Sequence, residues 1–210
     1  MKLRHLTILL ALLGCAAPAR GQSGDRARPV PVGYGSLTQD DLSLRVRNDE
    51  IEIRFMPLDR RLAPLIAPDA YQSLRSLLET HRRSIDSVAA RAGVAQPGLA
   101  LVSFFGQRPD VRFDAQTLTL VIRNQIVRPL GFIPLSGKFT SGQLGIREQA
   151  SAIALFDQDI PVNDSFVLSY GALTSSDWGT KQQTLNRERA RVAARSRTEV
   201  RDTFGQNRQK

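Results

Sequence analysis

Short apolar runs that alternate with polar residues dominate the chain between residues 42 and 171. Leu42–Arg47 and Glu50–Phe55 both alternate with a period of two, which is typical of strands with one buried face. Asn48 and Asp49 lie between them and favour a tight turn. We therefore expect the two runs to form a β-hairpin.

Further strand-like runs follow, each bounded by glycine, proline, aspartate or asparagine. They are Leu99–Phe105, Thr117–Val127, Phe132–Leu135, Leu144–Glu148, Ala150–Phe156 and Phe166–Tyr170. The first of these is apolar on both faces and predicts a central strand, whereas the second predicts one long strand. Short strands at this spacing, without helices between them, indicate an antiparallel β-sandwich or barrel-like domain.

One long amphipathic helix is expected between the first hairpin and the later strands. From Asp69 to Ala92, apolar residues recur at steps of three and four and form one stripe that includes His81. Asp69 is placed to cap the first turn, with Gln72 three residues later, and Gly93 is a natural stop. The chain is therefore expected to be a mostly β member of the α+β class, followed by a basic C-terminal tail that can form a helix.

The N-terminus has the pattern of an export signal. Lys2 and Arg4 precede the apolar run Leu6–Leu13, and small residues follow it. The run is too short to span a bilayer as a helix, which takes about 20 apolar residues. We expect the working protein to lie outside the cytoplasm.

Leu12-Leu13-Gly14-Cys15 resembles the lipobox of bacterial lipoprotein precursors, and Cys15 is the single cysteine of the chain. The resemblance covers residues 1–15 and implies cleavage before Cys15, lipidation of its thiol and attachment to a membrane. Alanine at position 16, rather than aspartate, implies sorting to the outer membrane of a two-membrane bacterium. The alternatives are ordinary cleavage after Ala19 or Gly21, which gives a secreted soluble protein, and an uncut anchor.

The sequence divides into four parts. We expect a signal peptide at 1–21, a flexible linker rich in glycine and proline at 22–41, a β-rich globular domain at 42–178 and a basic tail at 179–210. With one cysteine the chain forms no internal disulfide, so the domain must be stabilised by its core.

The formal net charge of +9 sits at the two ends of the chain. Residues 22–180 hold 17 basic and 17 acidic groups, whereas residues 181–210 hold nine basic groups and three acids. The tail carries the arginines Arg187, Arg189, Arg191, Arg195, Arg197 and Arg201. Two interpretations stand: an electrostatic arm for anionic lipid or another acidic envelope polymer, or a solvated and fraying end whose apolar stripe is too thin to bury much area. Nucleic acid is not an expected partner, because no binding motif is present and aromatic residues do not interleave with the basic ones.

No catalytic grouping stands out in the sequence. After removal of the signal, His81 is the single histidine, and a zinc site of ordinary composition cannot be assembled. The chain has no Gly-x-Ser-x-Gly elbow, phosphate-binding loop or dinucleotide fingerprint. We expect no enzyme activity and no cofactor.

Two short stretches offer weaker candidates for binding. Asp157, Asp159, Asn163 and Asp164 gather oxygen ligands of the kind that calcium prefers, although the spacing differs from an EF-hand and an acidic turn explains it equally well. Within 128–139, Leu130, Phe132, Ile133 and Leu135 would offer an apolar sheet edge to a partner, or would cover the end of the core.

These features favour an exported, lipid-anchored envelope protein that acts as a binding or scaffold module for an unidentified envelope partner. Two alternatives remain: a carboxylate-dependent hydrolase of cell-wall or glycan material, which needs two carboxylates facing each other in a cleft, and a carrier with a cavity for a small apolar ligand.

Overall fold

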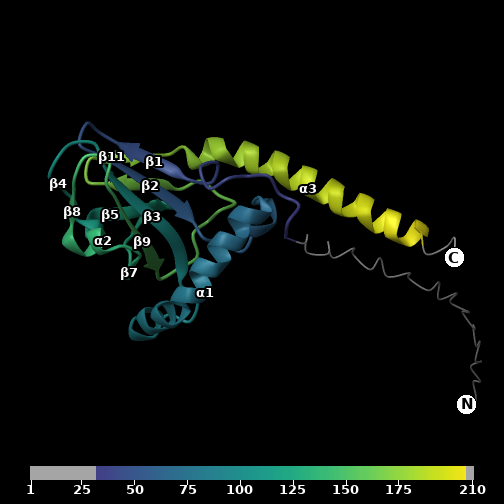
Figure 1. The fold of residues 1–210 in the computed structure, drawn as a ribbon, viewed down its shortest axis with the longest axis horizontal. Helices are drawn as coiled ribbons and strands as arrows, with labels where there is room; N and C mark the ends of the chain where they lie inside the picture. Colours follow the sequence, from purple (N-terminus) through teal and green to yellow (C-terminus); the bar gives the residue numbers. More distant parts are fainter. Residues whose placement is uncertain (1–31, 207–210) are drawn as a thin grey trace, which may run out of the picture.

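The computed structural model of the chain describes residues 32–206, with side chains described as far as Arg197. The predicted signal peptide, Cys15 and the first part of the predicted linker lie outside the described residues. The described chain is mostly antiparallel sheet with helices on its outside, as the sequence predicts (Figure 1).

Eleven strands form three sheets within residues 32–206. The larger sheet has the order β1-β2-β3-β9-β7, the second β11-β10-β5-β6, and β4 pairs with β8 alone. The strands are β1 (Leu44–Arg47), β2 (Ile51–Pro57), β3 (Gly98–Gly106), β4 (Val111–Arg112), β5 (Leu118–Ile122), β6 (Gln125–Val127), β7 (Gly131–Pro134), β8 (Gln143–Leu144), β9 (Gln149–Phe156), β10 (Val167–Tyr170) and β11 (Leu173–Ser175). The helices are η1 (Ala63–Leu65), α1 (Pro68–Arg91), η2 (Ala115–Thr117), α2 (Gly137–Ser141) and α3 (Trp178–Gln206).

The predicted first hairpin and central strand are confirmed. β1 and β2 pair antiparallel, and the Asn48 carboxamide oxygen accepts hydrogen bonds from the backbone N–H groups of Glu50 and Ile51 at the turn. β3 lies in the middle of the larger sheet, between β2 and β9. A strand in this position is covered on both faces, which explains why its sequence is apolar on both parities.

The prediction of one long strand over Thr117–Val127 is wrong. The chain reverses at Arg123 and Asn124, whose φ angles are 50° and 64°, so that β5 and β6 form a hairpin. Two successive residues with positive φ are the requirement of a type I′ turn, and asparagine tolerates that conformation better than most residues do. The sequence carries this signal in Asn124, but its neighbour is arginine rather than the usual glycine or asparagine.

The core lies between the two larger sheets. Phe55 of β2 makes edge contacts with Phe156 of β9 and Phe166 just before β10, at centroid distances of 6.1 and 6.2 Å. Phe104 of β3 stacks on Phe113 at 4.4 Å. All of these rings except Phe113 are at most 2% exposed, so the domain has the buried core that a chain without disulfides requires.

Helix α1 covers part of the opposite face of the larger sheet. Ile85 packs in a separate cluster with Ile133, Ile153 and Leu155, residues that point away from the sandwich core. The predicted cap is wrong: the helix begins at Pro68, and no side chain caps its first turn. Proline at the first helical position has no N–H to satisfy and its φ is already helical, which explains the start.

Helix α3 lies along the domain and continues past it (Figure 1). The expectation that the tail is solvated and buries little is wrong for its first half, because Trp178, Leu185 and Val192 are each at most 1% exposed. No helix among residues 32–206 is both long enough and apolar enough to cross a bilayer.

The last residues of the predicted linker pack against the domain. Leu37 is 7% exposed and pairs with Ile66 in an isolated parallel bridge. Its N–H donates to the carbonyl of Leu65 at 2.9 Å. We call residues 34–41 the lead-in segment.

Candidate functional site in helix α3 and the lead-in segment

One face of α3 binds the domain. Trp178, Leu185 and Val192 follow one another at steps of seven residues, which places them on one side of a helix with 3.6 residues per turn. The Trp178 ring lies 5.1 Å from Phe166, and its Nε1 donates to the carbonyl of Val162 at 3.3 Å. These three apolar residues are enough to dock α3 on the domain because each is at most 1% exposed.

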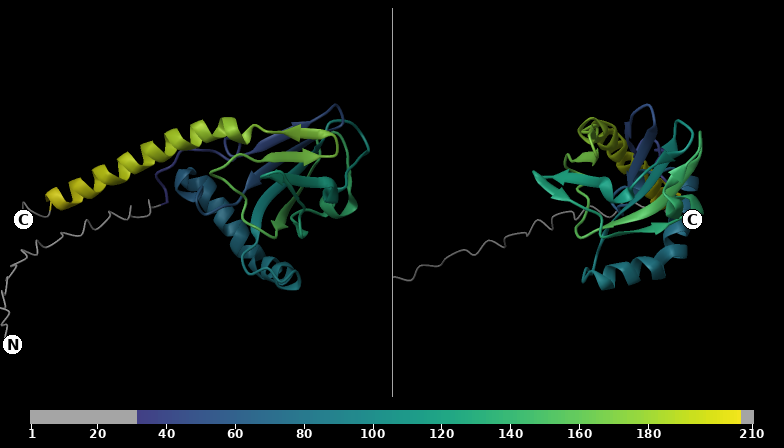
Figure 2. Two further views of the ribbon diagram at one scale, coloured as in Figure 1. Left: turned by 180° about the vertical axis from the view of Figure 1, so that it is seen from behind. Right: turned by 90° about the vertical axis from the view of Figure 1, so that its left-hand side faces the viewer.

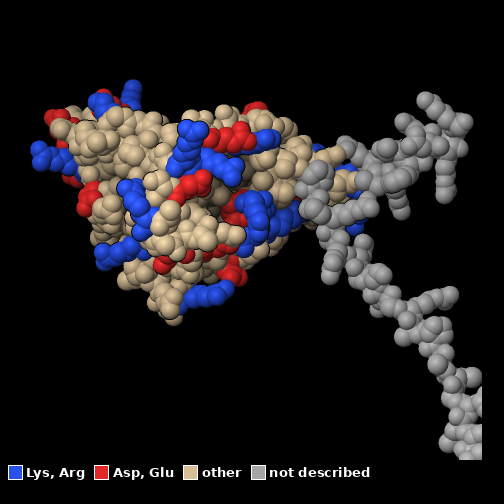
Figure 3. Space-filling view, turned by 90° about the horizontal axis from the view of Figure 1, so that it is seen from below, with Lys and Arg blue, Asp and Glu red and all other residues tan. Residues whose placement is uncertain are grey.

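Most of the predicted tail arginines lie on the exposed side of the helix. Arg187, Arg191 and Arg195 form a row at steps of four, and Arg197 is exposed as well but points to another side, since two residues turn the helix by about 200°. We call these four residues the arginine stripe. On the face drawn in Figure 3, by contrast, acidic and basic side chains are interspersed over the body.

Arg189 is separate from the arginine stripe and faces the domain. Its guanidinium is half-buried and donates to the side-chain oxygens of Asn163 at 2.7 Å and Asn186 at 2.8 Å. Burial lowers the pKa of Arg189, and repulsion by Arg61 lowers it further. The sixth predicted arginine, Arg201, is in α3, but its side chain lies outside the described part.

Glu188 fastens α3 to the lead-in segment. It is 6% exposed, and its Oε1 accepts hydrogen bonds from the N–H of Ser36 at 2.8 Å, the Oγ of Ser36 at 3.1 Å and Nη2 of Arg191 at 2.7 Å. Burial alone would raise the pKa of Glu188, but the hydrogen bonds from Arg191 and Ser36 outweigh it and leave the pKa lowered. Sequence patterns do not predict the contact between Glu188 and Ser36, since these residues are about 150 positions apart.

We expect Glu188→Ala to lower the free energy of unfolding by about 2 kcal/mol at neutral pH, because Ser36 then loses its acceptor. The native pKa lies below the unfolded one, so this contribution is present above the ordinary glutamate pKa of about 4.3 and disappears as the pH falls through the native pKa. Urea unfolding at several pH values measures it. Equal stability of the wild-type protein and the variant at pH 7 would contradict the assignment.

The lead-in segment runs antiparallel along α3. Lys181 Nζ donates to the carbonyls of Asp40 and Asp41, Glu188 meets Ser36, and Nη1 of Arg195 donates to the carbonyl of Tyr34 at 3.2 Å. Contacts thus move toward the C-terminal end of α3 as the residue number of the segment falls. In Figure 2 the start of the segment and the far part of α3 lie on the same side of the domain.

The predicted calcium ligands face arginines instead of one another. Asp159 lies 3.9 Å from Arg61, Asp164 lies 3.3 Å from Arg123, and Asn163 accepts from Arg189. Asp157 is exposed. Within the described residues, no three His, Cys, Asp or Glu side chains converge as a metal site would need. The loop therefore acts as an acidic turn that helix α3 and its neighbours hold in place.

The predicted apolar edge for a partner is also not offered as one surface. β7 is the outer strand of the larger sheet, but Ile133 is 6% exposed and Phe132 packs against the main core. Leu135 packs in the cluster under α1, and Leu130 alone of the four is exposed, at 37%. This arrangement matches the alternative in which the residues cover the core.

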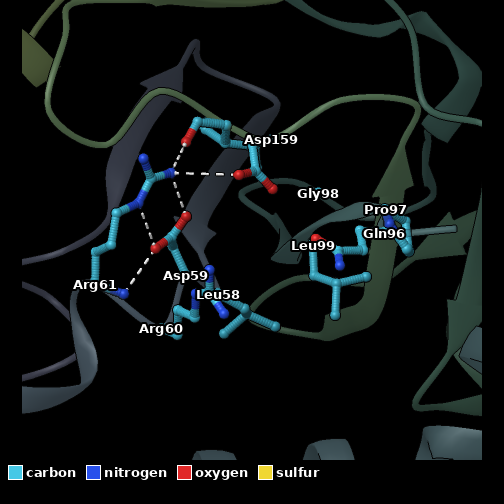
Figure 4. Close-up of a pocket in the computed structure, with 10 residues that line it drawn as sticks. Leu58, Asp59, Arg60, Arg61, Gln96, Pro97, Gly98, Leu99 and Asp159 are labelled. Carbon is cyan, nitrogen blue, oxygen red and sulfur yellow. Dashed lines mark hydrogen bonds and ion pairs between the residues drawn. The ribbon is translucent and has the colours of Figure 1, made fainter.

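A surface cavity of about 310 Å³ lies where the β2–η1 connection, the start of β3 and the loop after β9 meet (Figure 4). It is lined by Leu58, Asp59, Arg60, Arg61, Gln96, Pro97, Gly98, Leu99, Asp159 and Ile160. Its two carboxylates, from Asp59 and Asp159, both lie against Arg61. Sequence reasoning missed this site, although Asp59-Arg60-Arg61 between Pro57 and Pro64 is a visible charged group in an otherwise apolar stretch.

Comparison of the chain with models of protein families, with curated proteins and with solved structures finds no match.

Proposed function

We propose that this chain is an exported, lipid-anchored protein of a bacterial cell envelope whose β-rich domain is a non-enzymatic binding or scaffold module. In this proposal Cys15 carries the lipid, and the arginine stripe of α3 is the domain's contact with an anionic surface. The supporting observation is that the lead-in segment runs antiparallel along α3, with Tyr34 beside Arg195.

This geometry links the two ends of the chain. A tether attached at Cys15 would reach the domain at Tyr34, after roughly 19 residues that span at most about 70 Å. Because the lead-in segment contacts Arg195 at that point, the proposed tether would join the domain beside the C-terminal half of α3. The arginine stripe is therefore carried by the part of the domain nearest to the proposed anchor.

Charge supports the same partner. Anionic headgroups attract exposed arginines near a bilayer, with about 1 kcal/mol for each basic residue. The body of the chain is neutral, so we expect no general attraction of the whole domain to an anionic surface. The proposed contact is confined to the arginine stripe.

Processing of the N-terminus tests the proposal. In cells treated with an inhibitor of lipoprotein signal peptidase, we expect the precursor to accumulate, and mass spectrometry of the mature protein should show Cys15 as a lipidated first residue. Cys15→Ser should abolish the lipid and release the protein from the membrane fraction. A mature chain that begins after Ala19 or Gly21 and carries no lipid would contradict the anchor, and an intact N-terminus on protein from the cell interior would contradict export.

A further inference from the structure

The turn between β8 and β9 holds an arginine in a backbone conformation that favours glycine. The N–H of Glu148 donates to the carbonyl of Gly145 at 3.1 Å, so Ile146 and Arg147 are the two central residues of a β-turn. The φ angle of Arg147 is 58°, whereas Ile146 is not among the described residues with positive φ, and this is the pattern of a type II turn. The third position of such a turn favours glycine or asparagine, because other side chains are strained there.

Arg147 differs from the other non-glycine residues of positive φ in the described chain, which are Asp110, Arg123 and Asn124. The Asp110 carboxylate accepts a side-chain hydrogen bond at 3.3 Å, and Arg123 has an ion pair at 3.3 Å. Asn124 is of a residue type that tolerates the conformation. The side chain of Arg147 is exposed and makes no hydrogen bond or ion pair among residues 32–206, so no contact of the fold compensates for its strain.

Ile146 places an exposed apolar side chain next to this arginine. It is 57% exposed and belongs to neither core cluster of the domain. Isolated exposed aliphatic residues are common on protein surfaces, but this one adjoins a residue that strains the backbone. Neither central side chain of the turn therefore serves the core, and glycine in place of the arginine would suit the free domain better.

The turn is held in place by its neighbours. The Glu148 carboxylate accepts hydrogen bonds from Lys138 Nζ at 2.9 Å and from the Gly145 N–H at 2.8 Å, and these contacts lower the pKa of Glu148. The Arg147 N–H donates to the Gly106 carbonyl at 2.9 Å, and the Gly106 N–H donates to the Glu148 carbonyl at 3.0 Å, which ties the turn to β3. A turn fixed in this way displays its side chains with little loss of conformational entropy on binding.

Position and charge indicate what kind of surface the turn fits. In Figure 1, β8 lies at one end of the domain, and α3 extends beyond the other end, where the proposed membrane contact is. Lys138 is paired with Glu148, so Arg147 carries the unpaired positive charge of this turn. An apolar side chain beside an unpaired guanidinium fits a protein surface on which carboxylates flank an apolar pocket, because arginine binds carboxylates through paired hydrogen bonds.

We propose that the turn 145–148 is the surface through which the domain binds another protein, with Ile146 in an apolar pocket of that protein and Arg147 against carboxylates at its rim. This inference rests on the proposed binding function and deepens it, because it names the surface that the partner covers. The proposal also explains why arginine occupies a position where glycine would stabilise the free domain: the side chain is used in the complex.

Photocrosslinking in intact cells tests this surface on the full chain. A diazirine-bearing aliphatic residue replaces Ile146, and in a matched control it replaces Ile126, which is 68% exposed and follows a turn whose Arg123 is paired with Asp164. We expect one discrete protein adduct from position 146 and none from position 126. Mass spectrometry of the adduct should place the crosslink beside aspartate or glutamate residues of the partner.

Substitutions at Arg147 show whether the adduct reports the proposed contact. Arg147→Glu should lower the adduct yield about tenfold, because it brings like charges together, whereas Arg83→Glu, at an exposed arginine of α1, should leave the yield unchanged. Arg147→Gly should lower the yield as well, but should raise the urea concentration at the midpoint of unfolding, since glycine relieves the strain. A purely structural role of Arg147 would not produce this combination.

Three results would each overturn the proposal: no protein adduct from position 146, equal yields from positions 146 and 126, or a yield that Arg147→Glu leaves unchanged. An adduct with lipid in place of protein belongs to the first of these and would assign the turn to a membrane surface. Failure of the lipidation test is distinguishable from all three, because the adduct reports the contact of the turn whether or not Cys15 carries a lipid.

Discussion

Replacement of Trp178 by alanine is expected to lower the free energy of unfolding by about 4 kcal/mol. The Trp178 side chain is fully buried, packs on Phe166 and, through that ring, continues the aromatic cluster of Phe55 and Phe156. Its removal leaves a cavity at the point where α3 joins the domain and deprives the Val162 carbonyl of one of its two donors. We therefore expect the variant to lose stability and helix α3 to detach from the domain.

Urea unfolding, followed by far-UV circular dichroism, measures this effect, and hydrogen exchange in α3 reports whether the helix has detached. Ile126→Ala is the matched control, because this large apolar side chain of β6 is 68% exposed and its truncation should change the stability by less than about 0.5 kcal/mol. A loss of less than about 1 kcal/mol for Trp178→Ala would show that α3 is not part of the cooperative fold.

The elements that the sequence predicts correctly are those with strong periodicity. Burial of one face produces the alternation in β1 and β2 and the apolar stripe of α1, and burial of both faces produces the apolar run of β3. These patterns can be read from the local sequence. The wrong predictions occur where a single residue determines the local backbone conformation. Asn124 reverses a run that otherwise reads as one strand, and Pro68 starts α1 without the side-chain cap that Asp69 suggests.

The candidate site could be predicted only in part. The arginines of the tail are visible in the sequence, but their division between an exposed stripe and the inward Arg189 follows from the docking of α3. That docking depends on three apolar residues at steps of seven, too few to distinguish a bound helix from a solvated one by pattern alone. Contacts across more than 150 residues, such as Glu188 with Ser36, leave no local trace.

Neutralisation of the arginine stripe is expected to weaken binding to anionic membranes about 100-fold. The variant replaces Arg187, Arg195 and Arg197 with glutamine and keeps Arg191, which donates to both Glu188 and Ser36. Because Arg195 also donates to the Tyr34 carbonyl, urea unfolding must show that the variant keeps the stability of the unmodified protein. Loss of about 1 kcal/mol for each of three arginines gives the expected factor. Cosedimentation of the processed Cys15→Ser protein with vesicles that contain phosphatidylglycerol measures the affinity without a contribution from the lipid.

The control variant replaces Arg83, Arg91 and Arg112, which are exposed and make no ion pair among the described residues. It removes the same net charge from the body, and its effect distinguishes a specific arm from the total charge of the chain. If both variants lose affinity equally, the arginine stripe has no special role. Retention of binding by the arginine-stripe variant would exclude the proposed contact.

Salt gives a second test of the membrane contact. Since screening shortens the range of surface charges to about 8 Å at physiological ionic strength, added salt should abolish most of the binding of the unmodified protein. In the proposed arrangement a contact of this strength would be enough, because a lipid tether that joins the domain beside Arg195 would hold the arginine stripe near the bilayer and raise the effective concentration of each weak ion contact.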